Sequence, residues 1–216
     1  GGVRVVVDTP PDFRQQALAH ELRHLDAVLF THSHADHIFG FDDIRRFNTI
    51  QDCVIPAYGA PATIADLKRV YPYVGAERHP QGLYRPRIDF REVNGPFAVG
   101  GLGVEPLPVE HGSQTVLGYR FEAEGCSLAY IPDCSGMGED VLSRLKGVNI
   151  MVLDALRHRP HPTHFTVAQS VEVLGQIRAG RSFLIHMSHD IDHAATEAGL
   201  PPGIRLAYDG LTLESG

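Results

Sequence analysis

The 216-residue sequence lacks long apolar runs, paired cysteines and a basic excess. No apolar run approaches the length of a membrane-spanning helix and no signal peptide opens the sequence, so we expect no membrane insertion. The three cysteines, Cys53, Cys126 and Cys134, have no paired spacing. This spacing favours free thiols in a reducing cytoplasm over a disulfide framework. The formal net charge of −7 argues against broad electrostatic binding of nucleic acid.

The composition that remains is ordinary for a globular protein, with 43% hydrophobic and 21% charged residues. No internal repeat, low-complexity tract or linker interrupts the sequence. Because a chain of this length can bury a full core, we expect a single domain over 1–216.

Short apolar runs alternate with helical patterns, which predicts a mixed α/β fold. Apolar runs bounded by turn residues predict strands, and apolar residues three or four positions apart predict helices. The predicted strands cover 3–7, 27–30, 54–58, 88–93, 97–99, 104–109, 116–124, 127–131, 149–153 and 183–185, and two short strands follow 201–202. The predicted helices cover 13–25, 42–48, 61–70, 138–145 and 166–178.

The densest polar motif is Thr-His-Ser-His-Ala-Asp-His at 31–37, directly after a buried apolar run. Its three imidazoles and one carboxylate are common metal ligands and are seldom needed for packing. On extended backbone His32 and His34 point to one side, while Asp36 and His37 lie past the turn and can face a second ion. The motif therefore predicts a site for two metal ions, and a solvated, His-rich loop is the alternative.

Further residues of metal-ligating type stand at the ends of predicted strands. His111, Asp133 and His186 each follow such a strand. A lone His111 is structural about as often as functional, and Asp133 is also a good helix N-cap. Rigid strands that end in such side chains can present metal ligands together.

The segment 157–166 places three imidazoles and two guanidiniums just before a predicted helix, where surface histidines are the alternative interpretation. Arg157 can pair with a phosphate, but a solvated arginine explains it equally well. Asp42 or Asp43 can orient a ligand histidine, and Asp154 has a similar position at a strand end. Helix capping explains these aspartates equally well.

Together these motifs resemble the metallo-β-lactamase-fold hydrolase superfamily. The resemblance implies an αββα sandwich with a dinuclear site at one edge of the two sheets, and Asp133 as the carboxylate that bridges the ions. The implied ligands are His32, His34, His111 and Asp133 for one ion and Asp36, His37, Asp133 and His186 for the other. Nitrogen and oxygen donors suit Zn²⁺, with Mn²⁺ as the alternative. Two such ions can hold a bridging hydroxide, and the resemblance gives Asp36 a catalytic task too.

The resemblance is greatest to the phosphoribosyl cyclic phosphate phosphodiesterase branch that accompanies carbon–phosphorus lyase. It rests on 8–14, 40–45, 153–157, 161–164, 186–189 and 207–210. It implies that His164 is a general acid or base that protonates the leaving alkoxide, with His161 as the main competitor. It also implies hydrolysis of a small sugar phosphate diester, with cyclic diesters among the candidates.

The sequence departs from this branch at its beginning. Relatives carry an upstream, Gly-rich first strand and a cysteine cluster, which forms a structural zinc site with a histidine that matches His189. This sequence starts after that segment. We therefore expect either a fragment that lacks the first strand or another task for His189. A missing strand exposes a sheet edge, so we expect disorder or partner contacts there, a homodimer among them.

Three other functions are alternatives to a cytoplasmic phosphodiesterase with a small-molecule substrate. A tRNA 3′-processing endonuclease is disfavoured by the acidic charge, and the 21 residues between His111 and Asp133 leave no room for a long RNA-gripping arm. A non-catalytic metal- or ligand-binding relative is disfavoured because such relatives lose ligands, whereas all seven ligand positions are filled here. Thioester or lactone hydrolysis is disfavoured by His164.

Overall fold

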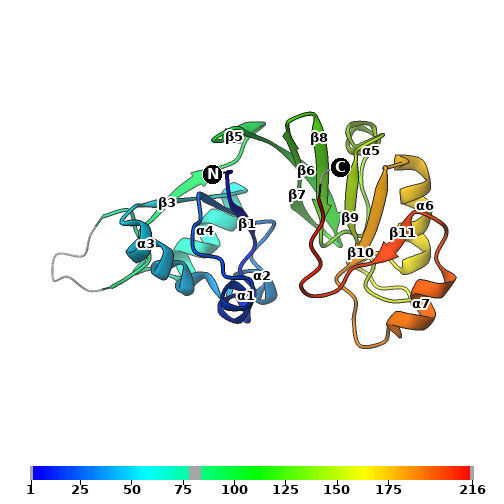
Figure 1. The fold of residues 1–216 in the computed structure, drawn as a ribbon, viewed down its shortest axis with the longest axis horizontal. Coiled ribbons are helices and arrows are strands. Elements are labelled where there is room, and N and C mark those ends of the chain that lie inside the picture. Colours follow the sequence, from blue (N-terminus) through cyan, green and yellow to red (C-terminus); the bar gives the residue numbers. More distant parts are fainter. Residues whose placement is uncertain (1, 78–83, 215–216) are drawn as a thin grey trace. The chain divides into compact units, whose positions relative to one another are not determined.

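The computed structural model describes residues 2–77 and 84–214. It divides into two compact units, 1–101 and 102–216, which are described separately (Figure 1). The single domain expected over 1–216 stays a prediction. No helix within the two described ranges is long and apolar enough to cross a membrane.

The first unit is built on a parallel sheet with the strand order β1-β2-β3-β4. Val28 of β2 pairs with Val6 of β1 on one side and with Ala57 of β3 on the other. A parallel strand between two neighbours is covered on both faces, which explains the fully buried β2. The strands are β1 (Val5–Val7), β2 (Ala27–Leu29), β3 (Ile55–Gly59) and β4 (Ile88–Glu92), and β5 (Phe97–Val99) follows in the sequence.

Helices of the first unit connect these strands and supply its core. They are α1 (Phe13–Ala19), α2 (Ala35–Ile38), the 3₁₀ helix η1 (Phe41–Ile44), α3 (Arg45–Gln51) and α4 (Pro61–Val70). The ring of Phe41 packs against those of Phe30 and Tyr71, with centroids 5.4 and 5.2 Å away. The Tyr71 hydroxyl donates to the Ile38 carbonyl at 2.8 Å, which ties α4 to the end of α2. The His-rich motif at 31–37 is therefore followed by a segment that buried aromatic rings hold in place.

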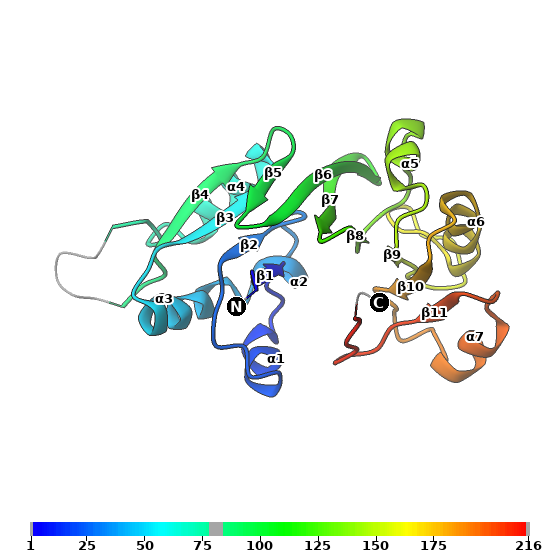
Figure 2. The same ribbon diagram turned by 45° about the horizontal axis from the view of Figure 1, so that its top comes forward.

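The second unit contains strands in the order β11-β10-β9-β8-β7-β6. β6, β7 and β8 pair antiparallel, and β8 to β11 pair parallel (Figure 2). The strands are β6 (Leu102–His111), β7 (Gln114–Ala123), β8 (Cys126–Ile131), β9 (Ile150–Asp154), β10 (Arg181–Ile185) and β11 (Ile204–Leu206). The helices are α5 (Glu139–Leu145), α6 (Val167–Ile177) and α7 (His193–Gly199).

Alternation along β9 divides the apolar side chains of the second unit between two faces of its sheet. Met151 and Leu153 belong to the core that α5 and α6 cover. Ile150 and Val152 belong to a smaller cluster on the other face. Since both faces are apolar, β9 is buried along its whole length and ends in the buried Asp154.

The predicted mixed α/β fold is confirmed, with two sheets and with helices that connect parallel strands. The antiparallel strands β7 and β8 are joined by a turn at Glu124 and Gly125, with φ of 52° and 77°, the left-handed values that a two-residue hairpin turn needs. The helix predicted over 42–48 forms as η1 followed by α3.

The structure differs from the predicted elements in three respects: one helix end, two helices that were not predicted and the number of strands after 201–202. The helix predicted over 13–25 ends at Ala19, because Glu21 takes a left-handed φ of 50° and the Leu22 N–H bonds back to the Ala17 carbonyl. No glycine marks this end. The short helices α2 and α7 were not predicted, since neither carries a long apolar pattern. The two strands predicted after 201–202 are replaced by the single strand β11 among the described residues.

Candidate metal centre

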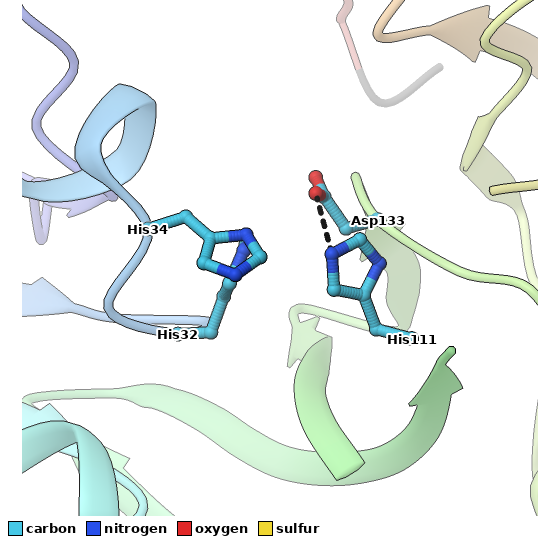
Figure 3. Close-up of side chains that lie close together, drawn as sticks. All are labelled: His32, His34, His111 and Asp133. Carbon is cyan, nitrogen blue, oxygen red and sulfur yellow. Dashed lines mark ion pairs between the residues drawn. The ribbon is translucent and has the colours of Figure 1, made fainter. Parts of the chain in front are cut away.

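The motif that follows β2 folds back on itself within the first unit. β2 ends at Leu29 and His32 follows in the loop, and α2 begins after His34 and returns His37 toward the strand end. The His32 ring lies 4.4 Å from the His34 ring and 4.1 Å from the His37 ring, centroid to centroid. Figure 3 shows the first pair side by side. His32 and His37 are buried, whereas His34 and Asp36 are exposed. The motif thus gathers three imidazoles at one strand end.

Asp8 orients two of these imidazoles from the end of β1. It accepts bonds at 2.8 Å from the Thr31 N–H, the Thr31 hydroxyl and His37 Nδ1. Because a carboxylate only accepts, Nδ1 of His37 carries the proton and Nε2 keeps its lone pair. The Thr31 hydroxyl donates its only proton to Asp8, so it can only accept from His32. His32 Nδ1, 3.0 Å away, therefore donates to the Thr31 oxygen. In both rings Nδ1 carries the proton, which leaves each Nε2 with the lone pair that metal binding requires.

No function was predicted for Asp8 from the sequence, although Asp8 directly follows the strand predicted over 3–7. Its carboxyl is buried, and burial raises its pKa while the bonds from His37 and Thr31 oppose that rise. Its backbone has a φ of 60°, which is strained for a residue other than glycine. The available sequence feature was an aspartate directly after the predicted strand 3–7, and the structure adds that this strand pairs with the strand before the motif.

In the second unit three imidazoles surround one carboxylate oxygen. Nε2 atoms of His111, His186 and His164 lie 3.7, 3.7 and 3.9 Å from Asp133 Oδ2. Figure 3 shows the His111 ring and the Asp133 carboxylate facing each other. These separations exceed hydrogen-bond length. Two ligand atoms of a tetrahedral Zn²⁺, each about 2.0–2.1 Å from the ion, lie about 3.3 Å apart. The spacing and the donor types therefore fit metal binding.

The Nδ1 atoms of two of these histidines are held by acceptors of the same unit. His111 Nδ1 donates to the Thr163 carbonyl at 2.8 Å. His164 Nδ1 lies 2.9 Å from Asp154 Oδ2. Each bond turns the Nε2 atom of its ring toward Asp133. This contact makes Asp154 an orienting partner for His164.

Asp154 is fully buried, and burial raises its pKa to about 8. Its Oδ2 accepts from the Cys134 N–H at 2.9 Å as well as from His164, and its backbone carbonyl accepts from Ser170 Oγ. These contacts fix the carboxylate in place. Ligand atoms of Asp133, His164 and His186 also lie within 4.8 Å of one another. His164 thus lies close to Asp133 and His186, while its Nδ1 atom is held by the Asp154 carboxyl group.

His186 occupies strained backbone directly after β10. Its φ of 61° is left-handed, a conformation that L-residues other than glycine rarely adopt. The Ala155 N–H bonds to the carbonyl of Ile185, and the Ser188 N–H bonds to that of Leu156, which holds the turn on both sides. Such strain is maintained where the position of a side chain matters for function. The half-buried His186 is therefore a strong candidate ligand.

The other two candidates in the 157–166 segment, Arg157 and His161, make hydrogen bonds within that loop. The Arg157 guanidinium donates to the carbonyls of Arg159 and Pro160, and Arg159 pairs with Asp190 at 2.6 Å. The His161 ring lies 5.1 Å from the His164 ring, and its Nδ1 accepts from the Thr163 N–H. The segment is thus held by its own polar groups around His164.

Two further candidates lie in contacts of another kind. Asp42 pairs with Arg45 at 3.2 Å and accepts from the Tyr73 hydroxyl at 2.8 Å. His189 is almost fully exposed and lies 3.6 Å from Asp190. The contacts of Asp42 therefore lie on η1 and its neighbours, whereas Asp8 orients the motif histidines.

Comparison with known proteins gives a family and several relatives. The model of the beta-lactamase superfamily domain matches residues 3–187. A crystal structure of a new diphosphatase from the PhnP family is 38% identical, with a TM-score of 0.88, over 98% of this chain and 80% of that chain. Zn²⁺-bound PqqB from Methylobacterium extorquens has the same fold, with 23% identity and a TM-score of 0.74 over 98% and 83% of the two chains.

A third relative is an octanoyltransferase from Porphyromonas gingivalis, 35% identical over 97% of this chain. The match covers 42% of that protein, so the chain spans about two fifths of its length.

Proposed function

The chain belongs to the beta-lactamase superfamily domain family and has the metallo-hydrolase fold, and on that premise we propose that it is a metal-dependent phosphodiesterase. The resemblance inferred from the motifs is confirmed by the match over 3–187 and by the likeness to the PhnP-family diphosphatase. The proposed substrate is a small sugar phosphate diester, cyclic or linear. The names of the relatives also include an octanoyltransferase, so the substrate class has to be argued from the site.

The observation that carries the proposal is the His164–Asp154 pair beside Asp133. An alkoxide leaving group is a strong base and needs a proton, which a positioned imidazole supplies. A thiolate leaves without one, because thiol pKa values are about 8.5. A histidine held at Nδ1 by a buried carboxylate, with Nε2 3.9 Å from Asp133 Oδ2, suits the first reaction and is not required by the second.

The proposed metal ligands are those that the family resemblance implies. We propose two ions, with Asp133 shared between them, and Zn²⁺ or Mn²⁺ as the metal. The ligands are His32, His34 and His111 for one ion and Asp36, His37 and His186 for the other. When bound, such ions stabilise negative charge on a phosphate and lower the pKa of water to about 7. Orientation of His32, His37 and His111 through Nδ1 supports this assignment.

The test is a substrate panel on protein that has been stripped of metal and reloaded with Zn²⁺ or Mn²⁺. We expect metal-dependent, saturable hydrolysis of bis(p-nitrophenyl) phosphate and of a cyclic ribose phosphate, and little action on an acyl thioester or a β-lactam. Asp133→Asn should abolish the activity and lower the metal content. His20→Ala is the matched control, because it removes an exposed imidazole at the end of α1.

Each contrary result favours a specific alternative. Faster cleavage of the thioester than of any diester would assign the chain to acyl chemistry. Cleavage of a tRNA precursor but of no small diester would indicate a tRNA-processing endonuclease. Full metal occupancy without activity on any member of the panel would indicate a non-catalytic relative.

A further inference from the structure

A cavity of about 710 Å³ lies between α1 and α3 of the first unit, the two helices labelled in Figure 2. Its volume falls in the range of small-molecule sites, about 300–1,000 Å³. The residues that line it come from α1, from the turn after it and from η1 and α3, and the exposed Tyr84 lines it as well. The predicted metal ligands do not line this cavity, so any ligand here would be separate from the proposed reaction.

The floor and rim of this cavity are apolar. The floor contains the buried rings of Phe13 and Phe47, 6.2 Å apart between centroids. Leu22, half-buried, packs beside them. At the rim, Leu18 is 71% exposed and Ile50 is 55% exposed. Two large aliphatic side chains held open to water beside an aromatic floor offer a surface that an apolar ligand group would cover.

The residues that line the cavity carry a net positive charge, whereas the whole chain is negative. Four arginines and two carboxylates line it, a surplus of two positive charges in a chain with a net charge of −7. Arg23 pairs with the carboxylate of Glu21 at 3.2 Å. Arg14 and Arg46 have no ion pair with any residue that the structure describes. Both guanidiniums are exposed, and neither donates a side-chain hydrogen bond to another residue that the structure describes, so these donors can serve a ligand.

We propose that this cavity binds a small amphiphilic anion. Arg14 and Arg46 hold a carboxylate or phosphate headgroup, and the apolar chain lies on the floor of Phe13 and Phe47 between Leu18 and Ile50. Guanidinium groups recognise both kinds of headgroup through paired N–H donors. The apolar floor requires a chain or ring on the ligand, which excludes a bare inorganic ion as the preferred occupant. The site is independent of the proposed phosphodiesterase activity.

The test is calorimetric titration of the metal-loaded chain of residues 1–216 with four probes, each amphiphile below its micelle concentration. The probes are dodecanoate, dodecyl phosphate, dodecyltrimethylammonium and inorganic phosphate. We expect both anionic amphiphiles to bind at one per chain, and the ammonium and inorganic phosphate at least tenfold more weakly. A preference of tenfold or more between dodecanoate and dodecyl phosphate identifies the headgroup.

Matched variants separate the two parts of the recognition. Arg14→Gln and Arg46→Gln should each weaken both anions about three- to tenfold. Ile50→Ser should weaken the amphiphiles about threefold. Arg178→Gln, which removes an exposed arginine of the second unit, should change neither affinity.

Four results would overturn the proposal. The first is equal binding of the anionic and cationic amphiphiles, and the second is unchanged affinity in both arginine variants. The third is loss of binding in Asp133→Asn, since that would place the anion at the candidate metal centre. Absence of any heat of binding up to the micelle concentration would overturn it as well.

Discussion

Replacing Asp154 with asparagine tests whether its carboxylate makes His164 a proton donor. Asp154 ends β9 with no exposed surface, and its Oδ2 is 2.9 Å from both the Cys134 nitrogen and His164 Nδ1. Asparagine has the same shape but offers one acceptor oxygen and one NH₂ group. The substitution therefore changes charge and proton pattern while it keeps the volume of the side chain.

The amide cannot satisfy its surroundings in either orientation. If its oxygen faces Cys134 and His164, its NH₂ group occupies the place of Oδ1, a buried atom that has no hydrogen-bond partner among the described residues. If the amide flips, its NH₂ group meets the Cys134 N–H. Each orientation leaves a buried donor unsatisfied, which costs about 1–3 kcal/mol. We expect the free energy of unfolding of Asp154→Asn to fall by about this amount.

The effect on catalysis should depend on the leaving group. In its ionised form, the Asp154 carboxylate accepts from Nδ1–H and stabilises the protonated ring of His164, and the amide does neither well. A positioned general acid contributes about 10²–10⁴-fold, and an orienting carboxylate can be worth up to about 10⁴-fold. We expect kcat for a diester with an alkyl leaving group to fall about 10²–10⁴-fold. The loss should be much smaller for p-nitrophenolate, which leaves without a proton.

The assay combines kcat on both diesters with metal content and urea unfolding. Ser170→Ala is the matched control, because Ser170 Oγ donates to the backbone carbonyl of Asp154 and leaves the carboxylate intact. It should cost about 1 kcal/mol of stability and leave kcat unchanged. A folded, fully metallated Asp154→Asn that retains kcat on the alkyl diester would refute the reasoning. Equal losses on both diesters together with loss of metal would show that Asp154 acts on the metal centre.

Three further predictions follow from the same contacts. Elemental analysis of protein expressed with added metal should give two ions per chain, and Asp133→Ala should lower this number and abolish hydrolysis of every diester; fewer than one ion per chain would contradict the proposed sites. His164→Ala should retain both ions and lose about 10²–10⁴-fold in kcat on alkyl diesters, whereas a fall in metal content would make His164 a ligand. Glu197 is partly desolvated, which raises its pKa, but the bonds from the Leu206 N–H and Arg205 outweigh this and hold the pKa below 4.5. A carboxyl group whose pKa is lower in the folded state stabilises the fold at pH values above its unfolded pKa. This contribution should be lost as the pH falls below about 4.5. In Glu197→Gln the free energy of unfolding should therefore depend less on pH in this range.

The residue types of the candidate centre could be predicted because they are concentrated in the sequence. His32, His34, Asp36 and His37 lie within one short stretch after a buried strand, so composition and spacing suffice. Asp8 lies 23 positions before Thr31, and its task exists only because β1 pairs with β2. A sequence pattern does not state which strands are neighbours.

Solvated, structural and functional uses of a polar residue could not be separated from sequence. Arg157 was an equal candidate for phosphate binding and for solvation, and the structure shows its guanidinium bonded to the carbonyls of Arg159 and Pro160. The end of α1 was missed for a related reason. It depends on a left-handed Glu21, and glycine is the residue by which such an end is normally recognised.

The orientation of the candidate ligands is a local property of each unit. Asp8 and His37 belong to the first unit, and Thr163, His111, Asp154 and His164 belong to the second. In each pair the acceptor fixes the proton on Nδ1 and leaves Nε2 as the donor atom. A ring whose tautomer and rotation are fixed by folding loses little freedom when it binds an ion. Asp8 and Thr163 therefore matter to metal affinity although neither is a proposed ligand, whereas Asp154 orients the proposed general acid His164.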